Sequence, residues 1–406
     1  MRRQRGVALL ILFLLLAVTG LTLFVTAHTD IRPRLDQMQR SQQALRWARE
    51  ALIGYAVNYP EISGTRGPGF LPCPDTDGNG VPNPPCSTGG VGTVGQLPWK
   101  TLGIDQLRDG TGAPLWYAVS NNFANFPGSL TINSDTRGSI TLRNSGNAVI
   151  NNGTDDSAVV AVVIAPGSPL QRQDGFNQTG RASQPYNPRQ FLDIAYGEDN
   201  ANFTNNTLNG FIMGPVRDAA GHVIANDLVL PITRGELLAA VEKRVAGDLR
   251  DTLNAYRVAC GVYPWAAPYG NPLTATYTSS PSLREGLLPV VTALPYNWGA
   301  SCASGNAPTL PAWFTADDWQ AVSYYALAPA ACTPGVNCLT VQNAPAPNNN
   351  VNALVILDGP ALAGQTRPSG SPGNYLEGQN ASPGDDVFER NATSSSFNDQ
   401  LRIVSP

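Results

Sequence analysis

The sequence is poor in charge, lysine and histidine, and these absences exclude several functions. Only 14% of the 406 residues are charged and the net charge is -4, so no basic surface for nucleic acid is expected. The only lysines are Lys100 and Lys243, and the only histidines are His28 and His222. The sequence contains no H-E-x-x-H, G-x-S-x-G or phosphate-loop motif. These absences predict a protein that is not an enzyme and does not bind nucleic acid.

Charge is also missing from one long stretch near the N-terminus. Residues 7–27 contain no charged side chain, and such a run is long enough to cross a hydrocarbon core of about 30 Å. Arg2, Arg3 and Arg5 precede the run, and the next arginine is Arg32. This asymmetry predicts a transmembrane helix over residues 7–28, with a cytoplasmic N-terminus and the rest of the chain outside.

Two amphipathic helices are predicted downstream of this run. The first spans about residues 34–59, where apolar side chains recur at three- and four-residue steps, and Pro33 should kink or break its junction with the membrane run. The second spans about residues 235–259, where Thr233 and Glu236 have the spacing of a capping box. Its polar face carries enough charge to make it a soluble helix.

The chain repeats itself across these two helices. LIGYAVNYP is similar to LNAYRVACGVYP. LPWKTLGIDQ and PLWYAV are similar to LPAWFTADDW and VSYYAL. AVVAVVIAPGSPLQRQ is similar to VNALVILDGPALAGQ, and NDLVLPI is similar to NDQLRIV. The order is kept throughout, which short chance matches rarely produce. We therefore predict an α+β fold in which a long N-terminal helix packs on a small antiparallel sheet, duplicated in tandem. The predicted parts are a leader (1–6), a membrane helix (7–28), a first domain (29–233) and a second domain without a membrane helix (234–406).

Six cysteines, an even number, favour structural disulfides in an exported protein. They allow 15 pairings, among which we expect sequence neighbours to pair: Cys73 with Cys86, Cys260 with Cys302, and Cys332 with Cys338. The alternative for the last pair is a zinc half-site. Neither histidine lies near enough in the sequence to complete one.

Together these features resemble the type IV pilin and pseudopilin superfamily. The resemblance rests on the leader RRQRG before a long apolar helix, the continuation of that helix into ALIGYA, and the GFLPCPDTDGNG and LPW blocks. It implies that a prepilin peptidase cleaves after Gly6 and methylates Val7. It also implies that the apolar helix first anchors the subunit in the inner membrane of a Gram-negative bacterium and later packs against other pilin or pseudopilin subunits. The alternative is an uncleaved signal anchor.

The sequence departs from this family at Ile11. Most members carry Glu at this fifth mature position, where it is thought to neutralise the N-terminal amine of a neighbouring subunit. An amine left without that partner is costly in an apolar setting, so ordinary incorporation into a filament shaft should be impaired. A subunit with no neighbour above it would not need the Glu. We therefore expect a minor subunit at the tip or initiation position of a type IV pilus or type II secretion filament.

One short loop could hold a cation. Asp75, Asp77 and Asn79 match the first half of a calcium loop, but Cys86 stands where a bidentate Glu would complete it. We expect a disulfide-closed turn, with a weak structural calcium site as the alternative and no other cofactor.

The aromatic side chains near the second helix could form a core or an exposed binding patch for glycan. We expect most of Trp265, Trp298, Trp313 and Trp319 to be buried. The competing function is a signal-anchored periplasmic binding or adhesion module that does not polymerise. Cleavage after Gly6 separates the two hypotheses.

Overall fold

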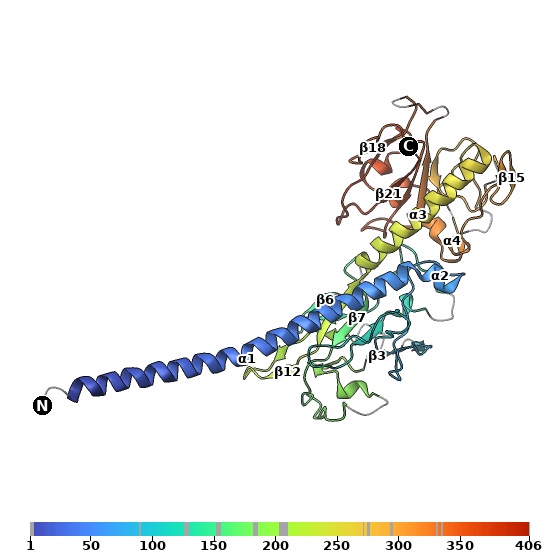
Figure 1. Cartoon of the computed structure of the whole chain (residues 1–406). Coiled ribbons are helices and arrows are strands. Elements are labelled where there is room, and N and C mark those ends of the chain that lie inside the picture. Colours follow the sequence, from blue (N-terminus) through green and yellow to red (C-terminus); the bar gives the residue numbers. More distant parts are fainter. Residues whose placement is uncertain are drawn as a thin grey trace.

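The computed structural model describes most of the chain. The described residues are 4–88, 91–125, 130–151, 156–181, 186–202, 210–270, 272–273, 277–292, 295–329, 332–333 and 336–405. Within these ranges, side chains are described except at residues 4–11, 20–33, 87–88, 91–92 and 151. Figure 1 shows a long helix that projects from a loop-rich body.

The projecting helix is α1, Gln4–Val57, and a short helix α2, Tyr59–Ser63, follows it. The C-terminal part of α1 lies against the body, where its buried side chains include Ala44, Leu45, Ala48 and Leu52. Figure 1 shows its N-terminal part extending away from the rest of the chain. Burial of this apolar face fixes the C-terminal part of α1 to the body.

Two four-stranded antiparallel sheets form the centre of the body. Sheet 1 has the order β13-β7-β4-β3, and sheet 2 has the order β14-β17-β19-β21. The strands of sheet 1 are β3 (Val94–Gln96), β4 (Trp116–Val119), β7 (Val159–Ala165) and β13 (Leu228–Thr233). Those of sheet 2 are β14 (Glu285–Leu287), β17 (Ser323–Leu327), β19 (Ala353–Leu357) and β21 (Gln400–Ser405). In both sheets each strand pairs with the next strand of the same sheet, and the strands of smaller sheets lie in the connections between them.

Smaller sheets are built from the connecting loops. β5 (Leu142–Arg143) pairs with β10 (Phe211–Ile212) in parallel and with β6 (Val149–Asn151) in antiparallel fashion, and β18 (Thr340–Gln342) pairs in parallel with β20 (Val387–Glu389). The two-stranded antiparallel pairs are β1 (Ser87–Thr88) with β2 (Val91–Gly92), β8 (Ile194–Ala195) with β9 (Glu198–Asp199), β11 (Val216–Arg217) with β12 (Val223–Ala225), and β15 (Ser301–Cys302) with β16 (Gly305–Asn306). Short helices complete the body: α4 (Ala312–Ala316) and the 3-10 turns η1 (Asn121–Phe123), η2 (Pro188–Gln190), η3 (Trp319–Ala321), η4 (Pro372–Asn374) and η5 (Gly378–Ala381).

The predicted fold class is wrong. We expected one small antiparallel sheet under a long helix in each of two tandem units, whereas the described chain is a mixed α/β structure with eight separate sheets, two of which contain parallel pairs. The long loops form many of these sheets, because their buried main-chain groups need hydrogen-bond partners. The predicted domain boundaries, including the one at residue 233, remain a prediction.

The predicted membrane helix also requires correction. Within the part of the chain that the structure describes, no helix combines the length and the apolar character needed to cross a membrane. The prediction of a transmembrane helix over residues 7–28, and with it the single-pass inner-membrane localisation, is therefore wrong for these residues.

Helix α3, Arg234–Cys260, begins where β13 ends. Thr233 is both the last residue of the strand and the N-cap of the helix, and the predicted capping box with Glu236 is present. Gly261 ends the helix in the left-handed conformation, at φ 75°, which favours glycine. No connecting loop separates sheet 1 from this helix.

One hydrophobic core runs through both sheet regions. It contains the buried faces of α1 and α3 together with the facing side chains of β7, β13, β17 and β19. Trp319 and Trp313 lie in this core, as predicted, and the half-buried Trp265 and Trp298 pack against it. Separate cores cover the opposite faces of sheet 1 and sheet 2. The two sheet regions therefore pack directly against each other.

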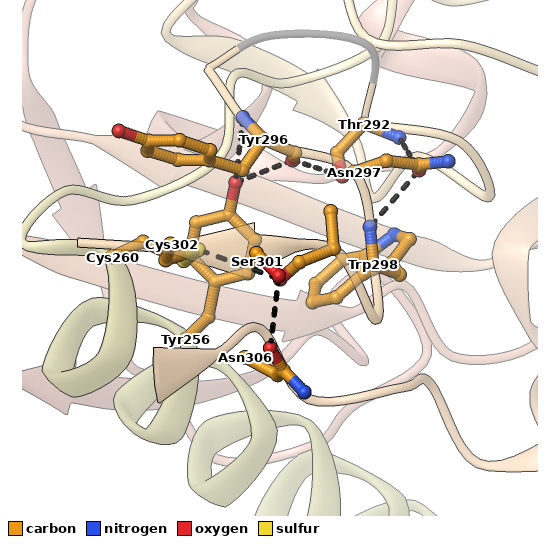
Figure 2. Close-up of a disulfide and its surroundings, with 10 residues drawn as sticks. Tyr256, Cys260, Thr292, Tyr296, Asn297, Trp298, Ser301, Cys302 and Asn306 are labelled. Atoms are coloured by element: carbon orange, nitrogen blue, oxygen red, sulfur yellow. Dashed lines mark hydrogen bonds between the residues drawn. A yellow bond between two sulfur atoms is a disulfide. The ribbon is translucent and has the colours of Figure 1, made fainter. Parts of the chain in front are cut away.

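Three disulfides staple the loops, and their pairing is the predicted one: Cys73–Cys86, Cys260–Cys302 and Cys332–Cys338. Figure 2 shows that the second of these joins the last turn of α3 to the β15–β16 hairpin. Beside it, the Tyr256 hydroxyl donates to the main-chain oxygen of Tyr296 at 2.6 Å, and the Tyr256 and Trp298 rings meet edge to face. Disulfides in this number are typical of an oxidising compartment.

Candidate functional site

The projecting part of α1 presents an apolar surface. Six large apolar side chains there are each 51 to 67% exposed: Leu12, Phe13, Leu14, Leu15, Leu16 and Val18. Over these described residues they point in all directions around the helix, because consecutive helical positions differ by about 100°. A helix that is apolar all round is normally buried. This segment is the clearest candidate for a binding surface.

The residues predicted to be processed lie beside this surface. Gly6, Val7 and Ile11 all belong to α1. Their side chains lie outside the described residues. Cleavage after Gly6, methylation of Val7 and the assembly role of position 11 therefore stay predictions.

The Asp75 loop is closed by hydrogen bonds of its own. Oδ1 of the buried Asp75 accepts the main-chain N–H groups of Asp77 (3.2 Å), Gly78 (2.7 Å) and Asn79 (3.3 Å), and Oδ2 accepts that of Gly80 at 2.6 Å. Burial raises the pKa of Asp75 despite these bonds. A carboxylate surrounded by N–H donors suits a tight turn. The weak calcium site at Asp75, Asp77 and Asn79 stays a prediction.

A half-buried arginine, Arg181, fastens the loop that follows β7. The Arg181 guanidinium donates to three main-chain oxygens: those of Gly167 (2.6 Å), Gln190 (2.9 Å) and Phe191 (3.2 Å). It also lies 5.1 Å from the centre of the Phe191 ring. Because charge-assisted hydrogen bonds are strong, this side chain holds the start of the loop at Gly167 to its later part at Gln190 and Phe191.

Arg367 does the same for the loop that follows β19. Its guanidinium donates to the main-chain oxygens of Gly359 (2.8 Å), Asn374 (2.8 Å) and Tyr375 (2.9 Å). It lies 5.4 Å from the centre of the Tyr375 ring. Gly167 and Gly359 both have φ in the left-handed region, at 66° and 64°, where the turn after the strand favours glycine. The two loops are therefore fastened by the same bonds at matching positions.

Each loop also carries a pair of buried carboxyl groups. In the first, the Asp193 N–H donates to Asp227 Oδ2 at 2.7 Å, and the Asn226 N–H donates to Asp193 Oδ2 at 2.6 Å. Burial raises the pKa of Asp193 to about 6, and burial together with the charge of Asp193 raises the pKa of Asp227 well above its ordinary value. The pair therefore keeps a proton when an exposed aspartate would have lost it.

The second pair is built in the same way from different residues. The Glu377 N–H donates to Asp399 Oδ2 at 3.1 Å, and the Asn398 N–H donates to Glu377 Oε2 at 3.0 Å. Burial, followed by the charge of Glu377, raises the pKa of Asp399. We call these groups the Arg181 network (Gln178, Arg181, Asp193, Asn200, Asn226, Asp227) and the Arg367 network (Gln365, Arg367, Glu377, Asn380, Asn398, Asp399).

Other ionisable groups are engaged in local pairs. His222 is exposed and lies 3.2 Å from Asp218 in the β11–β12 turn. The acidic segments YGEDN and PGDDVFE each place a carboxylate against an arginine: Glu198 against Arg143 at 2.8 Å, and Asp386 against Arg284 at 2.6 Å. These contacts stabilise loops, and they bring none of these carboxylates into an acid–base pair with another.

The sequence did not single out either arginine network. One signal was available, because the repeat match between NDLVLPI and NDQLRIV places Asn226 and Asp227 opposite Asn398 and Asp399. Buried polar residues kept between two repeats point to a shared hydrogen-bonding role. No family model matches the chain, and neither the curated proteins nor the solved structures contain a match.

Proposed function

We propose that this protein is a structural subunit of a filament of the type IV pilin or pseudopilin kind, at the tip or initiation position. The observation that carries the proposal is the exposed apolar surface of α1 from Leu12 to Val18, which extends beyond a disulfide-stapled body. Subunits of this kind work by helix packing and need no turnover chemistry.

The energetics of that surface favour a helical partner. Burying one Leu or Phe side chain contributes about 1.5 to 3 kcal/mol, and six apolar side chains are at least half exposed here. A partner must therefore surround the helix from several sides. Helices of neighbouring subunits, each apolar over a similar length, can do this.

The tip position follows from the residue at position 11. Ile11 offers no carboxylate to an N-terminal amine of a subunit above it, so packing is favourable on the lower side only. The large body, with two sheet regions that share one core, would crowd a helical shaft but not its end.

The first test is the mass of the N-terminal peptide in cells with and without an active prepilin peptidase. We expect a peptide that begins at methylated Val7 and that disappears when the peptidase is absent. An unprocessed Met1 terminus in both strains would contradict the proposal and leave a binding module that does not polymerise.

A second test addresses the surface itself. Leu15→Glu should abolish co-purification with filament subunits, because a charge would be buried among apolar helices. Met38→Glu is the matched control, since Met38 is also exposed on α1 but lies outside the apolar segment. Equal loss in both variants would argue against a specific role of this surface. Ile11→Glu should increase incorporation into the shaft, and no change would remove the main support for the tip position.

A further inference from the structure

A cavity of about 720 Å³ lies between the sheet 1 region and the sheet 2 region. The sheet 1 region contributes Arg137, Asp156 and Ser157, and Arg234 lines it from the start of α3. The loop of residues 360–365 and the hydroxyl-bearing residues 393–395 close the other side. The lining combines charged and hydroxyl-bearing side chains with the apolar residues Pro360 to Ala363, and none of its residues is aromatic. It therefore suits a small ligand with a charged group.

Arg234 has fewer hydrogen-bond acceptors than its guanidinium requires. The residue is 3% exposed. Its Nη2 donates to the main-chain oxygen of Ser134 at 2.5 Å, whereas Nη1 lies 3.9 Å from Asp156 Oδ1, beyond hydrogen-bond distance. Nε has no partner among the described residues. Because a guanidinium carries five N–H donors and buried donors are normally paired, the described residues leave Arg234 short of an acceptor at this place.

The charges around the cavity indicate what kind of acceptor is missing. Arg137 and Arg234 contribute two positive charges to the lining, and Asp156 contributes one negative charge. Burial lowers the pKa of Arg234, the carboxylates of Asp156, Asp135 and Glu242 raise it, and the charge of Arg137 lowers it again. Ser157, Thr393, Ser394 and Ser395 add hydroxyl groups at the rim. A negatively charged oxygen group would meet donors here from more than one side.

We propose that this cavity binds a small ligand through an oxyanion, a phosphate or a carboxylate group, held by Arg234 and Arg137. The ligand contacts both sheet regions at once, so its binding favours their observed packing. The proposal does not rest on the filament function and concerns the isolated chain alone.

The test is calorimetric titration of the purified full chain with sodium phosphate and, separately, with citrate, against chloride at equal ionic strength. We expect one site per chain for at least one of the two anions. Binding of phosphate alone would identify a phosphate ligand, and binding of citrate alone a carboxylate ligand.

The exposed Arg137 allows the site to be tested without disturbing the core. Arg137→Gln should weaken binding about tenfold or more, as expected for the loss of one charge-assisted contact. Arg217→Gln is the matched control, because Arg217 is also solvent-exposed but lies in the β11–β12 hairpin. Absence of binding to both anions, or equal binding by Arg137→Gln and the unchanged chain, would overturn the proposal.

Discussion

The Arg181 and Arg367 networks hold two loops of different sequence with the same set of hydrogen bonds. Phe191 is matched by Tyr375, Gln190 by Asn374, and Asp193 by Glu377, yet each arginine reaches the same three main-chain positions. The comparison shows that the loops after β7 and β19 place hydrogen-bond donors and acceptors at matching positions, although the side chains at those positions differ. Such a network tolerates substitution only where hydrogen bonding is preserved.

The two helices that cover the sheets differ more than the networks do. The sequence match that aligns Tyr55 with Tyr256 also aligns the buried Ser41 of α1 with the buried Glu242 of α3. The Ser41 hydroxyl accepts the Gly110 N–H at 2.9 Å, whereas Glu242 accepts a bond from Gln400 at 2.5 Å. One helix thus buries a neutral group and the other an ionisable one.

The largest effect is expected from removing the arginines. Arg181→Ala should lower the free energy of unfolding by about 3 kcal/mol, because three main-chain oxygens lose a charged donor. Arg367→Ala should cost more, since Arg367 also lies 3.4 Å from Asp135 in the sheet 1 region. Denaturant unfolding measures both losses.

Amide hydrogen exchange separates the two variants. Arg181→Ala should release protection in the loop after β7, and Arg367→Ala in the loop after β19. Lysine at either position should restore part of the loss. If one of the two alanine variants lowered the free energy of unfolding by less than about 1 kcal/mol and the other did not, the two networks would not be equivalent.

A smaller effect is expected at Glu242. Burial raises its pKa from an ordinary value of 4.5 to about 8. Between these values the unfolded chain is ionised while the folded protein keeps its proton, so this group lowers stability as pH rises. Glu242→Gln should therefore gain about 2 kcal/mol at pH 7 and flatten the fall in stability between pH 5 and 8. Ser41→Ala, its counterpart on α1, should leave that pH slope unchanged.

The smallest effect is expected at Asp227 and Asp399, the two buried aspartates that each lie beside a second carboxyl group. The pKa of Asp227 and that of Asp399 are raised in the folded protein. Each group therefore lowers the free energy of unfolding as pH rises above the ordinary pKa of an aspartate. Asp227→Asn and Asp399→Asn should change stability by less than about 1 kcal/mol at pH 4 and make it less dependent on pH up to 7. Unfolding midpoints across this range, with the exposed Asp105→Asn as control, check whether both respond with the same sign.

The sequence predicted the local elements of this molecule better than its architecture. The capping box at Thr233 and Glu236 and the three disulfide pairs depend on residues close in the chain, where spacing limits the outcome. The buried strand β7 has a continuous run of apolar, mostly β-branched residues, which is typical of a buried strand. These features follow from side-chain chemistry that acts over short distances.

The fold class and the site residues depend on contacts between residues far apart in the chain, which the spacing of residues in the sequence does not predict. The parallel pair β18–β20 joins two loops on either side of β19, and Arg234 meets Ser134 across 100 positions of the chain. The membrane helix was predicted from a long uncharged run and the arginines that precede it, and the described residues do not support it. Asp75 matched half of a calcium motif, and the structure shows its oxygens accepting main-chain N–H groups of the turn.

The direct passage from β13 into α3 has a mechanical consequence. β13 is the last strand of sheet 1 and pairs only with β7, from Leu228 opposite Ala165 to Thr233 opposite Val159. Ladder hydrogen bonds stand perpendicular to the strands. A force applied by α3 along β13 therefore acts across all of these hydrogen bonds at once, in shear. The bonds share the force because they cannot break one after another from one end. Tension between the projecting helix and the far end of the body would meet its strongest resistance at this strand.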